Sequence, residues 1–322
     1  MLQSHQNLGR TTKALYYTLV LLFVATGCQE AANTTTTPKE DPATAIRNFS
    51  TDSTIITTPT EGLDRRAVEF NKTGLKQLTV SFEFAKAIKN FSKAIEIEPT
   101  VATFYDNRGG AKYKLGQYSD SLADFKKAIE LDPDSAPAHS NRAMVWIATK
   151  DYPAAIADCE KAIELDPRRA EPYYNKGNAL MNSGSPGPAI QWFTDALKRK
   201  PNYQSALYMR GWAKQDLGDH ESAIEDYSRA IELNPQDALS YNNRGNARGI
   251  LGDLPGGIED CTNAIQIAPK LAIAYENRGG MKFRQKEYRS ALEDIERALK
   301  IDPNLPTSQR ARQILQQILS SQ

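Results

Sequence analysis

The side chains that usually carry catalysis are sparse in this chain of 322 residues, and they do not gather into a site. The three histidines are His5, His139 and His220, and each belongs to a different segment. A shared metal ion or a nucleophile and base pair is therefore not expected. The stretch 245–253, GNARGILGD, contains three glycines but no phosphate-binding pattern. We expect no catalytic residue, no bound metal, no cofactor and no enzymatic activity.

The chain is organised by prolines that recur at a constant interval of 34 residues. They are Pro99, Pro133, Pro167, Pro201, Pro235, Pro269 and Pro303. A fixed interval of this length is typical of stacked-repeat solenoids, in which each unit buries its apolar face only against its neighbours. We number the repeat so that the proline is position 32.

Small residues recur at three further positions of the repeat. Position 27 is always alanine: Ala94, Ala128, Ala162, Ala196, Ala230, Ala264 and Ala298. Position 20 is alanine, serine or glycine, and position 8 is glycine in most repeats, as in Gly109 and Gly177. A glycine within a helix costs about 1 kcal/mol against alanine, so its recurrence indicates that two helices pack closely there. Cys159 and Cys261 share position 24 three repeats apart, too far for a disulfide, and we expect both to be core residues.

With glycine at position 15 and tyrosine at position 17 in several repeats, this pattern resembles the tetratricopeptide repeat family over residues 64–322. The resemblance implies an all-α, right-handed superhelical solenoid of seven helix-turn-helix repeats with a C-terminal capping helix. The expected repeats are 68–101, 102–135, 136–169, 170–203, 204–237, 238–271 and 272–305, and the expected capping helix is 306–320. The first repeat has one extra residue between positions 8 and 20.

The N-terminal 63 residues do not share the repeat pattern. Arg10 and Lys13 precede an uncharged run at 14–24, which is shorter than the ~20 residues that span a bilayer. The following VATGC, ending at Cys28, resembles the cleavage box of bacterial lipoproteins, which implies a signal peptide at 1–28 and a lipid on Cys28. Gln29, rather than aspartate, then favours the outer membrane. Ordinary secretion and a retained membrane anchor are the alternatives.

Residues 29–63 contain ten threonines and no helical periodicity. Such a segment cannot bury enough apolar surface to offset the entropy of ordering it. We expect it to be a disordered linker between the lipid and the repeats.

The family resemblance also implies where a ligand binds. In tetratricopeptide repeats the first helix of each repeat lines the concave face, and positions 2, 5, 6, 9, 12 and 13 usually meet the ligand. The candidate groove residues are Asn107, Asn141, Tyr174, Asn175, Asn178, Tyr208, Trp212, Asn243, Asn246 and Asn277. Asparagine amides could bracket a peptide main chain, and tyrosine and tryptophan are common interface anchors. Alternatively, Trp212 packs against the neighbouring helix.

The asparagines have a structural alternative as well. Position 7 is arginine and position 23 is aspartate in every repeat from the second onward except the fourth, which has Lys176 and Trp192. The shared exception suggests that arginine and aspartate pair along the stack, and the asparagines at position 6 could belong to the same network.

The composition and charge limit the classes of function that the chain could have. A net charge of +1 does not favour nucleic-acid binding, which calls for a strongly basic face. We expect an exported, membrane-tethered scaffold or adaptor of the cell envelope that binds a protein or peptide in its concave groove, with no small-molecule substrate. One alternative is an accessory subunit that presents substrate to a cell-envelope enzyme. Another is an RNA-binding helical repeat, which would require cytoplasmic residence.

Overall fold

A computed structural model describes residues 62–321, which form helices α3–α17 and, over this range, no strand. The predicted all-α solenoid is therefore confirmed. The predicted signal peptide at 1–28, its lipidated Cys28 and the linker up to residue 61 lie outside the described residues. No helix between 62 and 321 is long and apolar enough to cross a bilayer.

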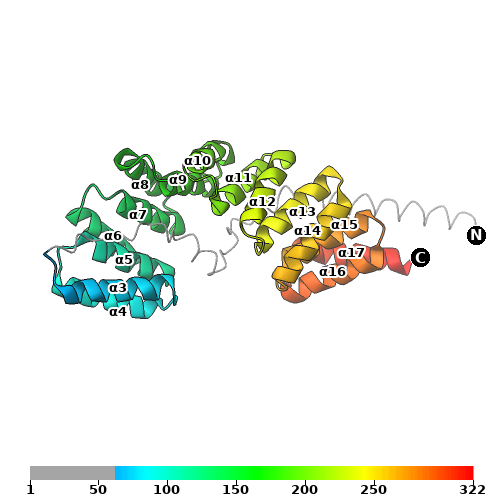
Figure 1. Ribbon diagram of the computed structural model, residues 1–322. Helices are drawn as coiled ribbons and strands as arrows, with labels where there is room; N and C mark the ends of the chain where they lie inside the picture. The colour runs from blue at the N-terminus through cyan, green and yellow to red at the C-terminus, as the bar shows by residue number, and fades with distance from the viewer. Residues whose placement is uncertain (1–61, 322) are drawn as a thin grey trace, which may run out of the picture. The chain divides into compact units, whose positions relative to one another are not determined.

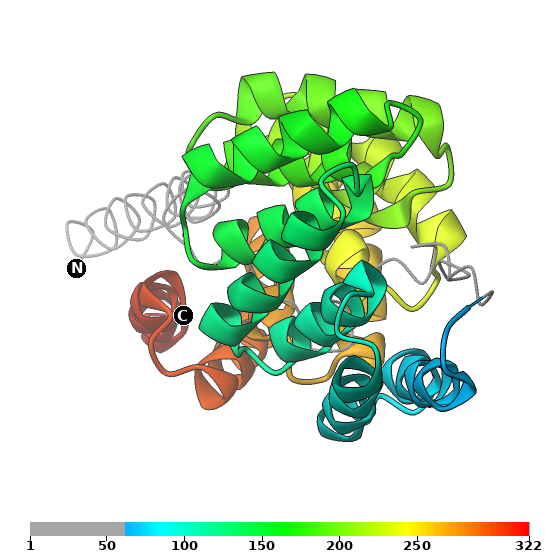
Figure 2. The same cartoon turned by 90° about the vertical axis from the view of Figure 1, so that its left-hand side faces the viewer.

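The chain divides into two compact units, with the boundary between Tyr203 and Gln204. The N-terminal unit contains four pairs of helices, which Figures 1 and 2 show from two sides. They are α3 (Arg65–Thr79), α4 (Phe84–Ile97), α5 (Ala102–Lys114), α6 (Tyr118–Leu131), α7 (Ala136–Ala148), α8 (Tyr152–Leu165), α9 (Glu171–Asn182) and α10 (Pro186–Arg199).

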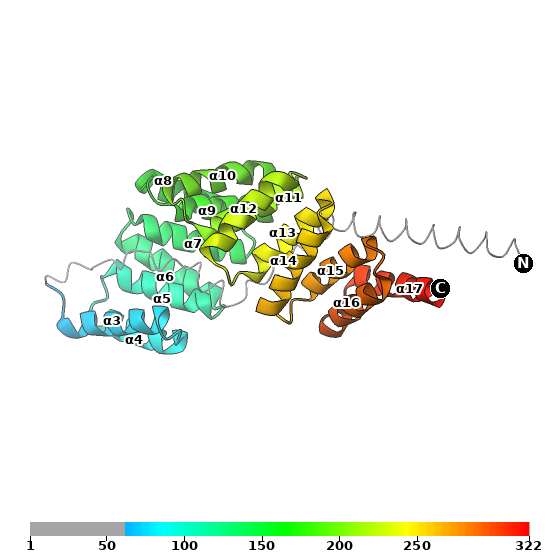
Figure 3. The ribbon, with the colours of Figure 1, turned by 45° about the vertical axis from the view of Figure 1, so that its right-hand side comes forward.

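The C-terminal unit contains three pairs and a last single helix, which Figure 3 shows in order. They are α11 (Gln204–Asp216), α12 (His220–Leu233), α13 (Ala238–Leu251), α14 (Leu254–Ile267), α15 (Ala272–Arg284), α16 (Tyr288–Ile301) and α17 (Pro306–Ser320). In both units the first helix of a pair and the second pack as an antiparallel hairpin, and each hairpin packs on the next.

Small residues allow the two helices of a hairpin to approach closely, as the sequence predicted. A Cβ atom added to Gly177 would lie 2.6 Å from Cε1 of Phe193, whose ring is fully buried. A Cβ atom at Gly245 would lie 2.8 Å from the backbone oxygen of Gly257. Since a buried ring and a backbone carbonyl have nowhere to move, these positions exclude any larger residue.

The turn within each hairpin needs one residue with a left-handed backbone. Gly116, Gly184, Gly218 and Gly252 supply it with φ between +73° and +98°. The first hairpin holds its extra residue in the loop 80–83, and its left-handed residue is Phe82 (φ +53°). In the third and seventh hairpins the left-handed residue is Lys150 (φ +65°) and Lys286 (φ +66°). This backbone costs a residue other than glycine about 1–2 kcal/mol.

Paired charges join the two helices of a hairpin, and this confirms the predicted pairing of positions 7 and 23. Asp124 accepts hydrogen bonds from Nε and Nη2 of Arg108 at 2.9 and 2.7 Å. The same two-bond contact joins Arg142 to Asp158, Arg210 to Asp226, Arg244 to Asp260 and Arg278 to Asp294. All five aspartates are buried.

Most of these aspartates bind a second cation from the same first helix. Asp124 contacts Lys112 at 2.7 Å, and Lys214, Arg248 and Lys282 stand in the same place in three later repeats. Asp158 is the exception, because it accepts a hydrogen bond from Trp146 Nε1 at 3.1 Å and contacts His139 Nδ1 at 3.1 Å. Burial alone would raise the pKa of Asp158, but the hydrogen bonds from Arg142 and His139 outweigh it and lower this pKa.

The fourth hairpin replaces the charge pair with an aromatic stack. Lys176 lies 3.8 Å from the centre of the Trp192 ring and binds Glu160 at 2.6 Å. The ring centre of Tyr173 lies 5.9 Å from that of Trp192, and the Arg199 guanidinium lies 3.5 Å from the Tyr173 ring centre. Positions 7 and 23 therefore depart from the pattern together in the fourth repeat because a cation–π contact there takes the place of the ion pair.

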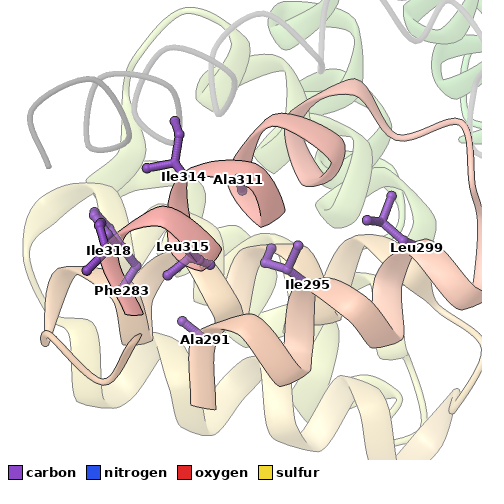
Figure 4. Packing of buried hydrophobic residues seen from close by; sticks show 8 residues of the cluster. All are labelled: Phe283, Ala291, Ile295, Leu299, Ala311, Ile314, Leu315 and Ile318. Atoms are coloured by element: carbon purple, nitrogen blue, oxygen red, sulfur yellow. The ribbon is translucent and has the colours of Figure 1, made fainter. Parts of the chain in front are cut away.

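Helix α17 covers the apolar end of the C-terminal unit. Ala311, Ile314, Leu315 and Ile318 pack against a buried cluster of α15 and α16 that Figure 4 shows from close by. The opposite face of α17 carries exposed arginine and glutamine residues. One apolar and one polar face are what a terminal cap requires.

We predict that Asp260→Ala lowers the free energy of unfolding by about 2–4 kcal/mol, because it strands two half-buried arginines, Arg244 and Arg248, without their acceptor. Chemical unfolding followed by circular dichroism measures the loss. The matched control is Glu259→Ala, an exposed neighbour on the same helix, which should change stability by less than about 0.5 kcal/mol. Equal small effects of the two variants would contradict the role given to the buried pairs.

Candidate functional site: the concave faces

The first helices of neighbouring repeats lie closer together than the second helices do. In the N-terminal unit α5 contacts α7 and α7 contacts α9, and in the C-terminal unit α11 contacts α13 and α13 contacts α15, whereas second helices of neighbouring repeats make fewer contacts. The first helices therefore lie on the inside of the curve that each unit makes. We call this side the concave face of each unit.

The asparagines of position 6 join neighbouring first helices. In the N-terminal unit Asn107 donates to Oδ1 of Asn71 at 2.9 Å. Asn141 donates to the carboxylate of Asp106 at 3.1 and 3.2 Å, and Asn175 donates to the backbone oxygen of Ser140 at 3.1 Å. In each case the acceptor is position 5 of the preceding repeat.

The C-terminal unit follows the same rule. Asn243 donates to the hydroxyl of Tyr208 at 3.2 Å, and Asn277 donates to Oδ1 of Asn242 at 3.0 Å. The asparagine row thus forms a ladder of hydrogen bonds between neighbouring first helices, and we call it the asparagine ladder. This role does not depend on a ligand. A ladder of this kind fixes the spacing of the first helices, because each amide must reach one acceptor.

A second chain of hydrogen bonds in the C-terminal unit runs from α12 to the first helices α11, α13 and α15. Tyr227 donates to Gln215 at 3.0 Å, Gln215 donates to Asn246 at 3.1 Å, and Asn246 donates to Asn277 at 3.3 Å. Predicted groove residues Asn246 and Asn277 therefore lie in contact. The sequence analysis did not include Gln215 and Asn242 among the groove residues, because their hydrogen-bond partners lie in neighbouring repeats. Their repeat positions, 12 and 5, were the signal that could have identified them.

The predicted aromatic residues are divided between the two units. Tyr174, in the N-terminal unit, is buried with its ring 5.0 Å from Tyr203, so packing occupies it. Tyr208 and Trp212 belong to α11 of the C-terminal unit and are both half-buried. Asn178 is half-buried on α9, and its Oδ1 atom is buried without a hydrogen-bond partner.

The concave face of the N-terminal unit also holds a charged group that the sequence did not reveal. Burial raises the pKa of Asp106 to about 6, although the hydrogen bond from Asn141 and the charge of Arg169 both lower it. Arg169 lies 3.5 Å from Glu171, and its Nε atom is buried without a hydrogen-bond partner. These residues come from different repeats and recur at no fixed interval, so no periodic pattern marks them.

The cysteines and histidines of the described residues are buried. Between 62 and 321 no three histidine, cysteine or acidic side chains are grouped to hold a metal. Cys159 and Cys261 are buried, and burial raises the pKa of both thiols. His139 is bound to Asp158, and His220 is buried in the other unit. The side chains of the concave faces offer hydrogen bonds and aromatic contacts, which are suited to binding another polypeptide.

Three family models of tetratricopeptide repeats match this chain. One described as "TPR repeat" matches residues 213–252, and two described as "Tetratricopeptide repeat" match residues 107–170, 170–203 and 272–305. The chain belongs to the tetratricopeptide repeat proteins. A search of curated protein sequences gave no match.

Solved structures with the same fold are distant in sequence. A chain of the APC/C hetero-tetramer Cut9–Hcn1 is 17% identical with a TM-score of 0.63, and the match covers 79% of this chain and 53% of that one. A protein described as Pseudomonas aeruginosa pilF is 18% identical with a TM-score of 0.59, covering 65% and 95%. A tetratricopeptide repeat protein from Parabacteroides merdae is 17% identical with a TM-score of 0.56, covering 79% and 100%. At these identities the likeness shows the fold alone.

We predict that Asp106→Asn stabilises the protein at pH 8 by about 1–2 kcal/mol, because it removes a charge that burial penalises but keeps an oxygen for Asn141. The folded state binds this proton at a pKa of about 6 and the unfolded state at about 3.8. Wild-type stability should therefore rise as the pH falls from 6 to 4, and the two proteins should converge near pH 4. Thermal unfolding at both pH values, with the exposed Asp134→Asn as control, tests this. A difference that does not depend on pH would contradict it.

Proposed function

We propose that this protein is an exported, membrane-tethered scaffold that holds a segment of another protein on its concave face. The observation that carries the proposal is the amide network of the C-terminal unit. Within this network Asn243, Asn246 and Asn277 are half-buried, whereas Gln215 and Asn242 are buried. The three half-buried amides are thus fixed by neighbouring helices on one side and open to a ligand on the other. The side chains are thereby oriented before a partner arrives, which lowers the entropy lost on binding.

An extended polypeptide is the ligand that best suits this network. Asn246 and Asn277 each use one N–H in the bonds between helices, and an asparagine amide has two. The second N–H of each amide can donate to a main-chain carbonyl of a bound segment. The asparagines recur from one first helix to the next, as carbonyl groups recur along an extended polypeptide. Trp212, which is half-buried on the first helix α11 of the same unit, adds a large apolar surface.

The proposed tether is the predicted lipid on Cys28, followed by the linker up to the first helix. A flexible chain of this length has a root-mean-square span of about 30–35 Å. The repeats would then search a shell near the membrane surface, where the local concentration of membrane-bound partners is high. The predicted location is the outer membrane of the cell envelope.

Trp212→Ala tests the binding surface. We expect the yield of partner protein cross-linked to the full-length chain in cells to fall at least tenfold, while helicity and melting temperature change little. The control is Trp192→Ala, because Trp192 is also half-buried but stacks on Lys176 and Tyr173; it should lower the melting temperature instead. If Trp212→Ala unfolds the protein as much as it reduces binding, Trp212 is a core residue and the assignment is wrong.

The identity of the recovered protein decides between two roles. Structural proteins of the envelope would support a scaffold, whereas recovery of one transferase or hydrolase would favour an accessory subunit that presents substrate.

Cys28→Ser tests the tether. Cells fed a clickable fatty acid should label the wild-type chain and leave the variant unlabelled, and fractionation should move the variant from the membrane to the soluble fraction. An equally labelled variant, or a wild-type chain that is soluble and keeps residues 1–28, would overturn the proposal.

A further inference from the structure

Helix α11 carries a stripe of three half-buried side chains on the concave face of the C-terminal unit. They are Tyr208, Trp212 and Asp216, at repeat positions 5, 9 and 13. Residues four apart on a helix lie on the same face with their Cβ atoms about 5–6 Å apart, so the side chains of Trp212 and Asp216 are neighbours. Gln215, which precedes Asp216, donates to Asn246 of α13 at 3.1 Å. The stripe therefore lies beside the amides that we propose to bind a polypeptide.

Trp212 differs from the other two tryptophans in the partners of its indole. Trp146 donates a hydrogen bond to Asp158, and Trp192 has the Lys176 ammonium over its ring. Among residues 62–321 Trp212 has no hydrogen bond, no aromatic contact and no cation over its ring. Because its side chain is only half-buried, part of this indole is open to a ligand.

Asp216 has no partner either. Among residues 62–321 it accepts no hydrogen bond and contacts no cation, and partial burial alone raises the pKa of its carboxyl. It is the last residue of α11, where the helix dipole favours a positive charge. The last residues of α5 and α15, at the same repeat position, are Lys114 and Arg284. The fold therefore does not require a carboxylate at residue 216, which leaves this carboxylate available to a ligand.

The fourth hairpin shows how this protein binds a cation with the same two groups. Lys176 Nζ lies 3.8 Å from the ring centre of Trp192 and binds the Glu160 carboxylate at 2.6 Å. The indole attracts the cation through its π face, and the carboxylate adds a charge-assisted hydrogen bond. Trp212 and Asp216 offer an indole and a carboxylate side by side, but the described part of the chain supplies no cation to them. A cation from a bound ligand would complete the arrangement.

We propose that Trp212 and Asp216 bind a lysine or arginine side chain of the polypeptide segment held on the concave face. The cation lies on the Trp212 ring and pairs with Asp216, while the main chain of the segment contacts Asn246 and Asn277. This inference rests on the proposed function and names the chemistry of its ligand. Neighbouring first helices are about 8–10 Å apart, and an extended chain advances about 3.3 Å per residue. The basic residue is therefore about three residues away from the one that contacts Asn246.

The test selects binders from a phage-displayed library of random twelve-residue peptides, once on the full-length wild-type chain and once on full-length Asp216→Lys. We expect lysine and arginine to be enriched about fivefold at one place in the peptides that bind the wild type, and aspartate and glutamate at that place in those that bind the variant. The variant should fold, because Lys114 and Arg284 occupy the same repeat position. The matched control is Glu225→Lys, the same change of charge at an exposed residue of α12, which should keep the wild-type preference.

A second measurement does not depend on charge reversal. It compares one selected peptide with the same peptide in which the basic residue is replaced by glutamine. Asp216→Asn should raise the Kd of the basic peptide about fivefold and leave that of the glutamine peptide nearly unchanged, because only the first pair loses an ionic contact.

The outcomes separate this inference from the proposed function. Selected peptides without a charge preference, the same preference in the wild type and Asp216→Lys, or an equal effect of Asp216→Asn on both peptides would overturn the basic-residue site and leave the proposed function intact. A library from which neither protein selects any peptide would contradict the site and the proposed function together.

Discussion

The stack depends on a buried carboxylate that joins the two helices in five of the seven described hairpins. In five repeats an aspartate of the second helix accepts two hydrogen bonds from an arginine of the first helix, at distances of 2.6–2.9 Å. A buried ion pair contributes little net stability against a well-packed apolar pair, but an aspartate left alone would be very costly. The pair therefore specifies register more than it adds stability, because only one alignment of the two helices satisfies it.

The asparagine ladder performs the matching task between hairpins. Small residues let the helices touch, the arginine and aspartate pairs align the two helices within a repeat, and each asparagine then reaches one acceptor on the preceding first helix. The concave face is therefore polar and ordered for structural reasons. This order is what makes it a suitable surface for another polypeptide, since its donors and acceptors are already held in place.

Sequence periodicity predicted the features that repeat and missed those that occur once. The prolines, the small residues and the charge pairs recur, so a single chain contains several copies of the same information, and the helical hairpins follow from it. Asp106 and Arg169 interact across repeats at one place only, and Phe82 follows a single inserted residue. The asparagine row was visible in the sequence, but its acceptors were not, because they lie 35 residues earlier and vary among aspartate, serine, tyrosine and asparagine. The division between Tyr203 and Gln204 was also not predicted, because the interval of 34 residues runs through it unchanged.

The central claim is that a partner binds to the first helices and not to the second. The most direct test is hydrogen–deuterium exchange of the full-length chain, alone and with the protein recovered by cross-linking. The account predicts slower exchange in α11, α13 and α15 when the partner is present, with α12, α14 and α16 unchanged. Protection confined to α12, α14 and α16 would contradict it.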